Sequence, residues 1–209
     1  MSKNLPPDLI RIVDDDPSVC ASLTFILQIV GFDVVSYNSA DQFLEQASQG
    51  RDGCVLLDVK MPGRSGLELF DEIRRRRMLL PVIFLTGHGD IEMAVQALHD
   101  GAFDFLVKPA EPERLIEKVK KAVQECRSVR CRAQEKREVE SLMARLTPAE
   151  AQVAQLMAKG LPVKTIASVL EVSEQAVKVH RSSVYHKLDV INLVEVAGIV
   201  TEWNRSREK

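Results

Sequence analysis

The sequence predicts an α/β domain built on a doubly wound, five-stranded parallel sheet, followed by a small all-α domain of four helices. Three observations lead to this fold class. Apolar β-like runs alternate with amphipathic helical runs up to residue 107, a long helical stretch follows, and only helical patterns occur after residue 147. Strand followed by helix, repeated along a chain, is typical of a parallel sheet with helices on both faces.

The five predicted strands are the runs LIRIV, DVVSY, GCVLLD, PVIFLT and FDFLV, at residues 9–13, 33–37, 53–58, 81–86 and 103–107. Amphipathic helices are expected between them, with Gly31, Gly50 and Gly101 at helix ends. No G-x-G-x-x-G fingerprint follows the first strand, and the chain has no P-loop motif. The sequence therefore gives no support to dinucleotide or P-loop nucleotide binding.

The stretch from about residue 111 to 146 has no Gly or Pro after Pro112 and predicts one long helix. An apolar seam with heptad spacing runs from Val119 to Ala133, but Lys136 and Glu140 interrupt it. A solvated linker helix is favoured over a coiled coil. The predicted domains are residues 1–125, a helical linker at 126–143, and residues 144–209.

The second domain opens with TPAE, in which Thr147, Pro148 and Glu150 suit the start of a helix with a capping box. Short helical patterns follow, and the second and third are joined by the tight connection EVS, with Ser173 as the expected cap. Two short helices joined by a tight turn are typical of a helix-turn-helix domain.

Composition narrows the possible functions. Residues 1–125 contain 14 Lys and Arg against 20 Asp and Glu, whereas residues 126–209 contain 14 against 10, which suggests two different tasks. The four Cys and four His lack the spacing of a zinc site. No apolar stretch approaches the ~20 residues that cross a bilayer, and the polar start is unlike a signal peptide, so a cytoplasmic protein without membrane contact is expected.

Polar side chains follow the predicted strands at one edge of the sheet. Asp14 and Asp15 follow the first strand, Asp58 and Thr86 end the third and fourth, and Lys108 follows the fifth. Ligands of open α/β sheets bind at the carboxyl ends of the strands. Clustered carboxylates suit Mg²⁺, and a carboxylate beside such a metal can accept a phosphoryl group as an acyl phosphate. Thr86 and Lys108 could then bind the added oxygens.

Residues 9–125 resemble the receiver domain of two-component response regulators, through the motifs VDDD, LLDVKMPGRSG, LTGHGD and GAFDFLVKP in this order. Residues 147–200 resemble the LuxR-type helix-turn-helix output domain, through LTPAEAQVAQLMAKG and VKVHRSSVYHKL. Together they point to the NarL/FixJ class of transcriptional regulators. The resemblance implies a flavodoxin-like receiver fold and a DNA-binding function switched by phosphorylation.

The resemblance also implies roles for single residues. Asp58 would accept phosphate from a sensor histidine kinase, and Lys108 would assist. Mg²⁺ would be held by Asp15, Asp58 and the backbone carbonyl of Lys60, with Asp14 contributing. Asp16 lies outside this set and is expected to be a loop acid. The switch pair would be Thr86 and Phe105, although Phe105 also fits plain core packing. In the family the bond between Lys108 and Pro109 is cis, and an aromatic residue often stands where this chain has Ala110.

The predicted recognition helix runs from about Ser173 to Leu188. By resemblance, three residues would reach base edges in the major groove and two would contact phosphates of double-stranded promoter DNA. The first group is Lys178, Val179 and Ser182, and the second is Arg181 and Lys187. The helix contains one acid, Glu174, which favours DNA over ordinary solvated positions. A homodimer is expected on phosphorylation.

Two other functions remain open from the sequence. Asp14-x-Asp16 at the end of the first strand also fits an aspartate phosphatase of the haloacid dehalogenase kind, with Asp14 as nucleophile. A degenerate receiver that works without phosphate, fused to a DNA-binding domain, is the other. The first is disfavoured by the helix-turn-helix domain and the second by the intact acidic set. We therefore expect a phosphoacceptor with at most weak autophosphorylation and autodephosphorylation, and no true enzyme.

Overall fold

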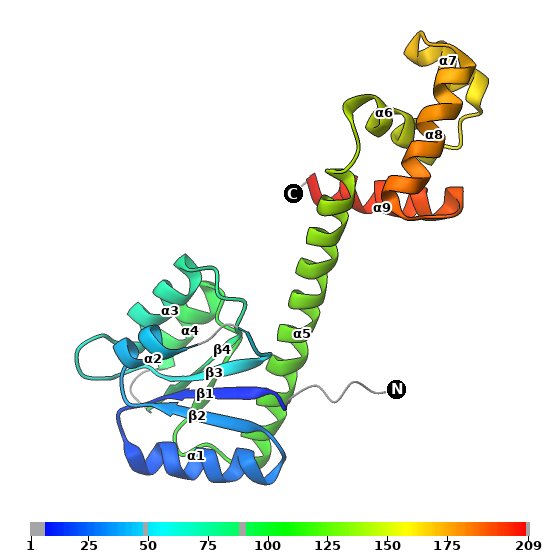
Figure 1. The fold of residues 1–209 in the computed structure, drawn as a ribbon. Helices are drawn as coiled ribbons and strands as arrows, with labels where there is room; N and C mark the ends of the chain where they lie inside the picture. The colour runs from blue at the N-terminus through cyan, green and yellow to red at the C-terminus, as the bar shows by residue number, and fades with distance from the viewer. Residues whose placement is uncertain (1–6, 48–49, 88–90, 208–209) are drawn as a thin grey trace. The chain divides into compact units, whose positions relative to one another are not determined.

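A computed structural model describes residues 7–47, 50–87 and 91–207 (Figure 1). The chain divides into two compact units, Met1–Arg130 and Cys131–Lys209. Helix α5, Pro112–Met143, begins in the first unit and ends in the second. The predicted linker, residues 126–143, lies within this one helix.

The first unit contains a parallel sheet with the strand order β2-β1-β3-β4-β5. The strands are β1 Leu9–Val13, β2 Asp33–Tyr37, β3 Gly53–Asp58, β4 Val82–Thr86 and β5 Asp104–Val107. Each strand agrees with its prediction to within one residue, because apolar runs bounded by polar or turn residues define buried strands closely. The predicted doubly wound fold is confirmed.

Helices cover both faces of the sheet, α1 Pro17–Ile29 and α5 on one and α2 Ala40–Gln46, α3 Gly66–Arg75 and α4 Ile91–His99 on the other (Figure 1). Two apolar cores result. On one face, Ile12 packs with Leu27 of α1 and Val119 of α5. On the other, Phe84 packs with Phe43 of α2 and Phe70 of α3. Burial on both faces explains why β1, β3 and β4 are continuous apolar runs.

Two expectations for the first unit need correction. Helix α2 ends at Gln46, where Ala47 already has extended backbone angles, so Gly50 does not end it. Asp16, expected to be a loop acid, is the N-cap of α1, because its carboxylate accepts the backbone N–H of Ser18 at 2.8 Å. The apolar seam of α5 packs in the core of this unit as far as Cys126.

The described part of the second unit contains four helices after the end of α5: α6 Pro148–Ala158, α7 Val163–Leu170, α8 Glu174–Leu188 and α9 Leu193–Arg207. The predicted capping box between Thr147 and Glu150 is present, and Ser173 caps α8. Val153, Ile166 and Val184 bring α6, α7 and α8 into a single core. Among the described residues, no helix combines the length and apolar character needed to cross a membrane.

Candidate functional site: an acidic sheet edge and an exposed recognition helix

The loop after β3 is held close to the end of that strand. Gly66 donates its backbone N–H to the carbonyl of Val59 at 3.0 Å. A Cβ atom at position 66 would lie 1.9 Å from the backbone oxygen of Asp58, so only glycine allows this approach. Ser65 and Glu68 then form a capping box that starts α3. These contacts hold the loop close to Asp58, and the carboxylate of Asp58 lies at the carboxyl edge of the sheet.

The sheet brings three carboxylates together at this edge. Val13 pairs with Leu57 in the register of β1 and β3, so the acids that follow them meet. Oxygen atoms of Asp14, Asp15 and Asp58 all lie within 4.8 Å of one another. Asp14 and Asp58 are buried, whereas Asp15 is exposed. The carboxylate of Asp14 also accepts the backbone N–H of Asp16 at 3.0 Å, which fixes its orientation.

Lys108 joins two of these carboxylates. Its Nζ lies 2.7 Å from Oδ2 of Asp14 and 3.0 Å from Oδ1 of Asp58. Burial lowers the pKa of this ammonium, but the hydrogen bonds to the two carboxylates outweigh burial and leave the pKa above its ordinary value. Lys108 therefore stays charged and offsets part of the negative charge at the edge. The bond from Lys108 to Pro109 is cis, as the family resemblance implied.

The pKa of Asp58 is raised above its ordinary value. Burial is the main cause, Asp14 and Asp15 raise it further, and Lys108 lowers it. Ionised Asp58 is thus costly in the absence of a further cation. The charge of Lys108 stabilises the ionised carboxylate, and a bound metal ion would stabilise it further.

Thr86 lies on β4, the strand next to the one that carries Asp58, and Phe105 lies on β5, the strand beyond it. Thr86 ends β4, is fully buried, and its hydroxyl donates to the carbonyl of Leu106 at 3.5 Å. Phe105 is half-buried on β5 and packs against the core that contains Phe84. The sheet therefore places Thr86 at the carboxyl end of β4 and Phe105 on the neighbouring strand, while their roles stay a prediction.

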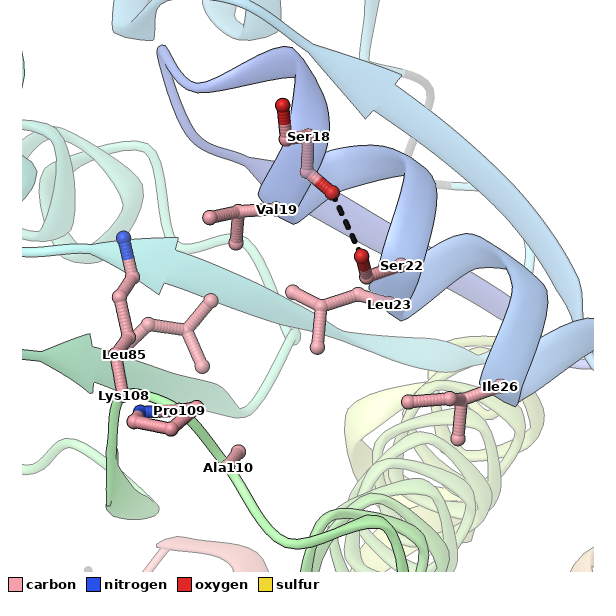
Figure 2. A pocket seen from close by; sticks show the side chains of 9 residues that line it. All are labelled: Ser18, Val19, Ser22, Leu23, Ile26, Leu85, Lys108, Pro109 and Ala110. Carbon is pink, nitrogen blue, oxygen red and sulfur yellow. Dashed lines mark hydrogen bonds between the residues drawn. The ribbon is translucent and has the colours of Figure 1, made fainter.

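A pocket opens beside Lys108, between α1 and the segment that follows β5 (Figure 2). Its volume is about 420 Å³. Val19, Leu23 and Ile26 point into it from α1, and Pro109 and Ala110 form the opposite wall (Figure 2). The pocket is thus mainly apolar and lies next to the charged cluster.

The carboxylate set fits a magnesium ion. Two of its acids are buried beside one another with a single ammonium between them, and Mg²⁺ prefers hard oxygen ligands of this kind. The part of the chain described here offers no cluster of Cys and His with three or more members for a softer metal. Lys60 is exposed two residues after Asp58, and its carbonyl as a ligand stays a prediction.

The recognition helix α8 presents most of the predicted DNA-contact residues to solvent. Lys178, Val179, Arg181 and Ser182 are all exposed, and Val177 and Val184 face the core. The Arg181 guanidinium lies 5.6 Å from the ring centre of Tyr185 and donates to its hydroxyl at 3.3 Å. This neighbour orients Arg181 along the helix without removing it from solvent.

Lys187 was expected to contact DNA phosphates from the outer face of α8, but the structure pairs it with an acid of its own domain. Its Nζ lies 2.7 Å from the carboxylate of Glu150, the buried capping-box acid of α6. Hydrogen bonds from Lys187 and from the backbone of Thr147 lower the pKa of Glu150 to about 2. Sequence reasoning found the capping box but missed that Lys187 ties α8 to it. A phosphate contact by Lys187 would have to compete with this ion pair.

These features define a receiver domain joined to a helix-turn-helix domain, and comparison with known families agrees. The family model of the response regulator receiver domain matches residues 10–120, and that of bacterial regulatory proteins of the luxR family matches residues 144–200. The chain belongs to the NarL/FixJ class of DNA-binding transcriptional response regulators of two-component systems. Of the motif LTGHGD, residues 88–90 lie outside the described part.

Several relatives match over nearly their whole length. Nodulation protein W of Bradyrhizobium diazoefficiens is 37% identical over 197 residues, which cover 91% of this chain and 87% of that protein. The tetrathionate response regulatory protein TtrR of Salmonella typhimurium is 36% identical, covering 90% of this chain and 89% of that protein. The solved structure of the response regulator StyR matches with 37% identity and a TM-score of 0.86, covering 94% of this chain and 99% of that chain. TtrR and StyR are response regulators by name.

Proposed function

We propose that Asp58 is the phosphoacceptor of this response regulator. The observation that carries the proposal is the contact of Lys108 with both Asp14 and Asp58, because it places a fixed cation beside a buried carboxylate. A carboxylate oxygen of Asp58 would form a bond to phosphorus as the bond from phosphorus to a kinase histidine nitrogen breaks. With a proton from solvent on its other ring nitrogen, the imidazole would leave as a neutral base that keeps the electron pair of the broken bond.

The other residues of the edge have separate tasks in this proposal. Asp14, Asp15, Asp58 and the carbonyl of Lys60 would hold Mg²⁺, which supplies charge neutralisation for the transferred oxygens. Lys108 would move its ammonium from the carboxylates toward the phosphoryl group. Thr86 would bind a phosphoryl oxygen through its hydroxyl, and Phe105 would turn inward behind it. Weak autophosphorylation from small donors and slow autodephosphorylation follow from the same groups.

Asp58 rather than Asp14 is the favoured nucleophile. Both oxygens of Asp14 already have partners, one in the backbone of Asp16 and one in Lys108, and the residue is fully buried. A phosphatase of the haloacid dehalogenase kind would need Asp14 accessible to its substrate. Sustained phosphate release from small phosphate esters would support that alternative, whereas a single stable addition supports the receiver.

We infer that the kinase approaches across the pocket of Figure 2, which gives it an apolar surface next to Lys108. Ala110 leaves this pocket open, at a position where relatives often carry an aromatic ring.

Ala110→Phe should fill part of the pocket and lower the rate of transfer from the kinase. Ala110→Ser, which keeps the volume, is the matched control. Phosphorylation by a small acyl phosphate should be equal in both variants, and a kinase rate unchanged in Ala110→Phe would contradict this route of approach.

The output of the switch is proposed to be paired binding to promoter DNA in the cytoplasm. Phosphorylation would favour a homodimer, whose two recognition helices engage two half-sites about one helical turn apart. Two weak interactions then combine into a stronger one without new base contacts. Footprinting with and without a small acyl phosphate tests this, and a single unpaired half-site in both states would contradict it.

A further inference from the structure

Lys118 connects the first turns of α5 with the strand that carries Phe105. Its Nζ forms an ion pair with the carboxylate of Asp104 and lies 6.0 Å from the centre of the Phe105 ring. Asp104 in turn accepts the backbone N–H of Phe105 at 2.8 Å. The side chain of Lys118 is only 16% exposed. The ammonium is therefore held near the ring by a neighbouring anchor and is not a freely moving surface group.

The position of β5 makes this contact informative. β5 is an edge strand of the sheet, and Phe105 packs on the face covered by α3 and α4. Its neighbour Leu106 packs on the opposite face, with Leu115 and Val119 of α5. The contact of Lys118 with Phe105 therefore passes around the sheet edge and links α5 to the face on which the switch residue lies.

We propose that Lys118 is a positioning residue that holds the Phe105 ring in the half-buried position described above and couples rotation of the ring to α5. The proposal rests on the function proposed above, in which Phe105 turns inward after phosphorylation of Asp58. When the ring turns inward, the cation over its face loses its partner, whereas the pair with Asp104 remains possible. Helix α5 continues to Met143 in the second unit. A change in the contacts of Lys118 therefore acts on the helix that joins the two units.

An ordinary surface ion pair would behave differently. A Lys–Asp pair alone stabilises the fold slightly and does not depend on where a neighbouring ring points. A cation near a ring face favours the ring position that makes the contact. Removal of the cation should thus shift the position of Phe105, an effect that a merely structural pair would not produce.

The test uses the full chain labelled with 4-fluorophenylalanine and read by fluorine NMR. The chain has seven Phe residues, and Phe105→Leu identifies the signal of interest by its loss. The wild-type signal is recorded without donor and then with acetyl phosphate and Mg²⁺, which defines its two end positions. Intact mass is measured on the same samples.

Three variants decide the result. Lys118→Met removes the cation and keeps the apolar stem, and it should move the unphosphorylated Phe105 signal toward the phosphorylated position, as a roughly two- to fivefold larger inward population. Lys118→Arg retains a cation and should stay near wild type. Asp104→Asn releases the anchor and should shift the signal in the same direction, and it serves as the test if Lys118→Met does not fold.

Failure of the two proposals can be told apart. If wild-type protein gains no phosphoryl group by mass, the proposed function fails. If it gains one but Lys118→Met leaves the Phe105 signal unmoved, or Lys118→Arg moves it equally, the inference on Lys118 is wrong while the function stands.

Discussion

The acidic sheet edge and the outer face of α8 both carry charge, but they hold it differently. At the sheet edge, Lys108 lies within 3.0 Å of two buried carboxylates, so the charges are paired before any ligand arrives. On α8, Lys178 and Arg181 are exposed to solvent. The first arrangement is suited to chemistry on a small group at fixed geometry. The charges on α8 need a partner that supplies the opposite charges. Single substitutions on α8 should therefore each weaken binding of that partner by a limited amount.

The largest expected effect is at the sheet edge. Asp15→Ala removes an exposed carboxylate from the predicted magnesium set and should lower Mg²⁺ affinity and the phosphorylation rate by at least roughly 100-fold, as loss of a ligand does in metal sites. Asp16→Ala is the matched control, because Asp16 only caps α1. Mg²⁺ titration and intact mass against time measure both. A wild-type rate in Asp15→Ala would remove it from the metal site.

A second variant separates the uptake of phosphate from the increase in DNA binding that follows it. Thr86→Ala should still take up phosphate at Asp58, because in the proposed function the hydroxyl binds the group only after transfer. It should nevertheless lose most of the increase in DNA binding that phosphorylation produces. Phosphorylation is followed by mass and DNA binding by titration of the phosphorylated protein. Equal loss of phosphorylation in Thr86→Ala and Asp15→Ala would show that Thr86 is not a relay.

On α8 the comparison is between reading bases and contacting phosphates. Lys178→Ala should weaken binding to the specific site by ~1 to 3 kcal/mol and relax the preference at one base pair. Arg181→Ala should weaken specific and scrambled duplexes alike and lower the salt slope by about one. Titrations at several salt concentrations distinguish them. Wild-type affinity of Lys178→Ala for the specific site would refute the base contact.

Lys187 should behave unlike either neighbour, because the structure gives it a partner within the domain. Glu150 has its pKa lowered from 4.5 to about 2, so its ionised form stabilises the fold above pH 4.5, and that contribution is lost as the pH falls toward 2. Lys187→Ala should lower the thermal midpoint by roughly 5 °C at pH 7, and the midpoint of the variant should fall less than that of wild type as the pH is lowered. An unchanged midpoint with uniformly weaker DNA binding would restore the phosphate role predicted from the sequence.

The smallest effect concerns the contribution of Asp58, the proposed phosphoacceptor, to the stability of the fold. Because the pKa of Asp58 is raised, the fold is most stable with this carboxyl protonated and loses stability as the pH rises through that pKa. Asp58→Asn should therefore raise the thermal midpoint slightly at pH 7 without Mg²⁺, and the gain should shrink as the pH falls toward 3.8. Calorimetry across this range measures it. A lower midpoint for Asp58→Asn at pH 7 would mean that Lys108 stabilises the carboxylate more than burial destabilises it.

The sheet and its edge could be predicted because they follow from local patterns. Each strand is an apolar run that ends at a polar residue, and parallel strands place those ends side by side. Asp14, Asp15, Asp58, Thr86 and Lys108 were thus found by their positions at or just after strand ends. The structure brings oxygens of the three acids within 4.8 Å of one another and Lys108 within 3.0 Å of Asp14 and Asp58.

Contacts between distant segments could not be predicted in this way. Lys187 and Glu150 lie on different helices, and helical periodicity gives the face of a residue but not the neighbour that packs against it. Arg11 is a second case, since it stands in the middle of an apolar strand and is fully buried, donating to the backbone carbonyl of Arg51 at 3.4 Å. Lys118 is a third, because its partners Asp104 and Phe105 lie on β5, and Phe105 packs on the opposite face of the sheet from α5.

The central claim is that Asp58, and not another acid of the cluster, forms the acyl phosphate. It is tested most directly by intact-mass measurement of the full chain after incubation with a small acyl phosphate and Mg²⁺, for wild type, Asp58→Asn and Asp14→Asn. The account predicts one added phosphoryl group in wild type and none in Asp58→Asn. Labelling that persists in Asp58→Asn and disappears in Asp14→Asn would contradict it and favour the phosphatase alternative.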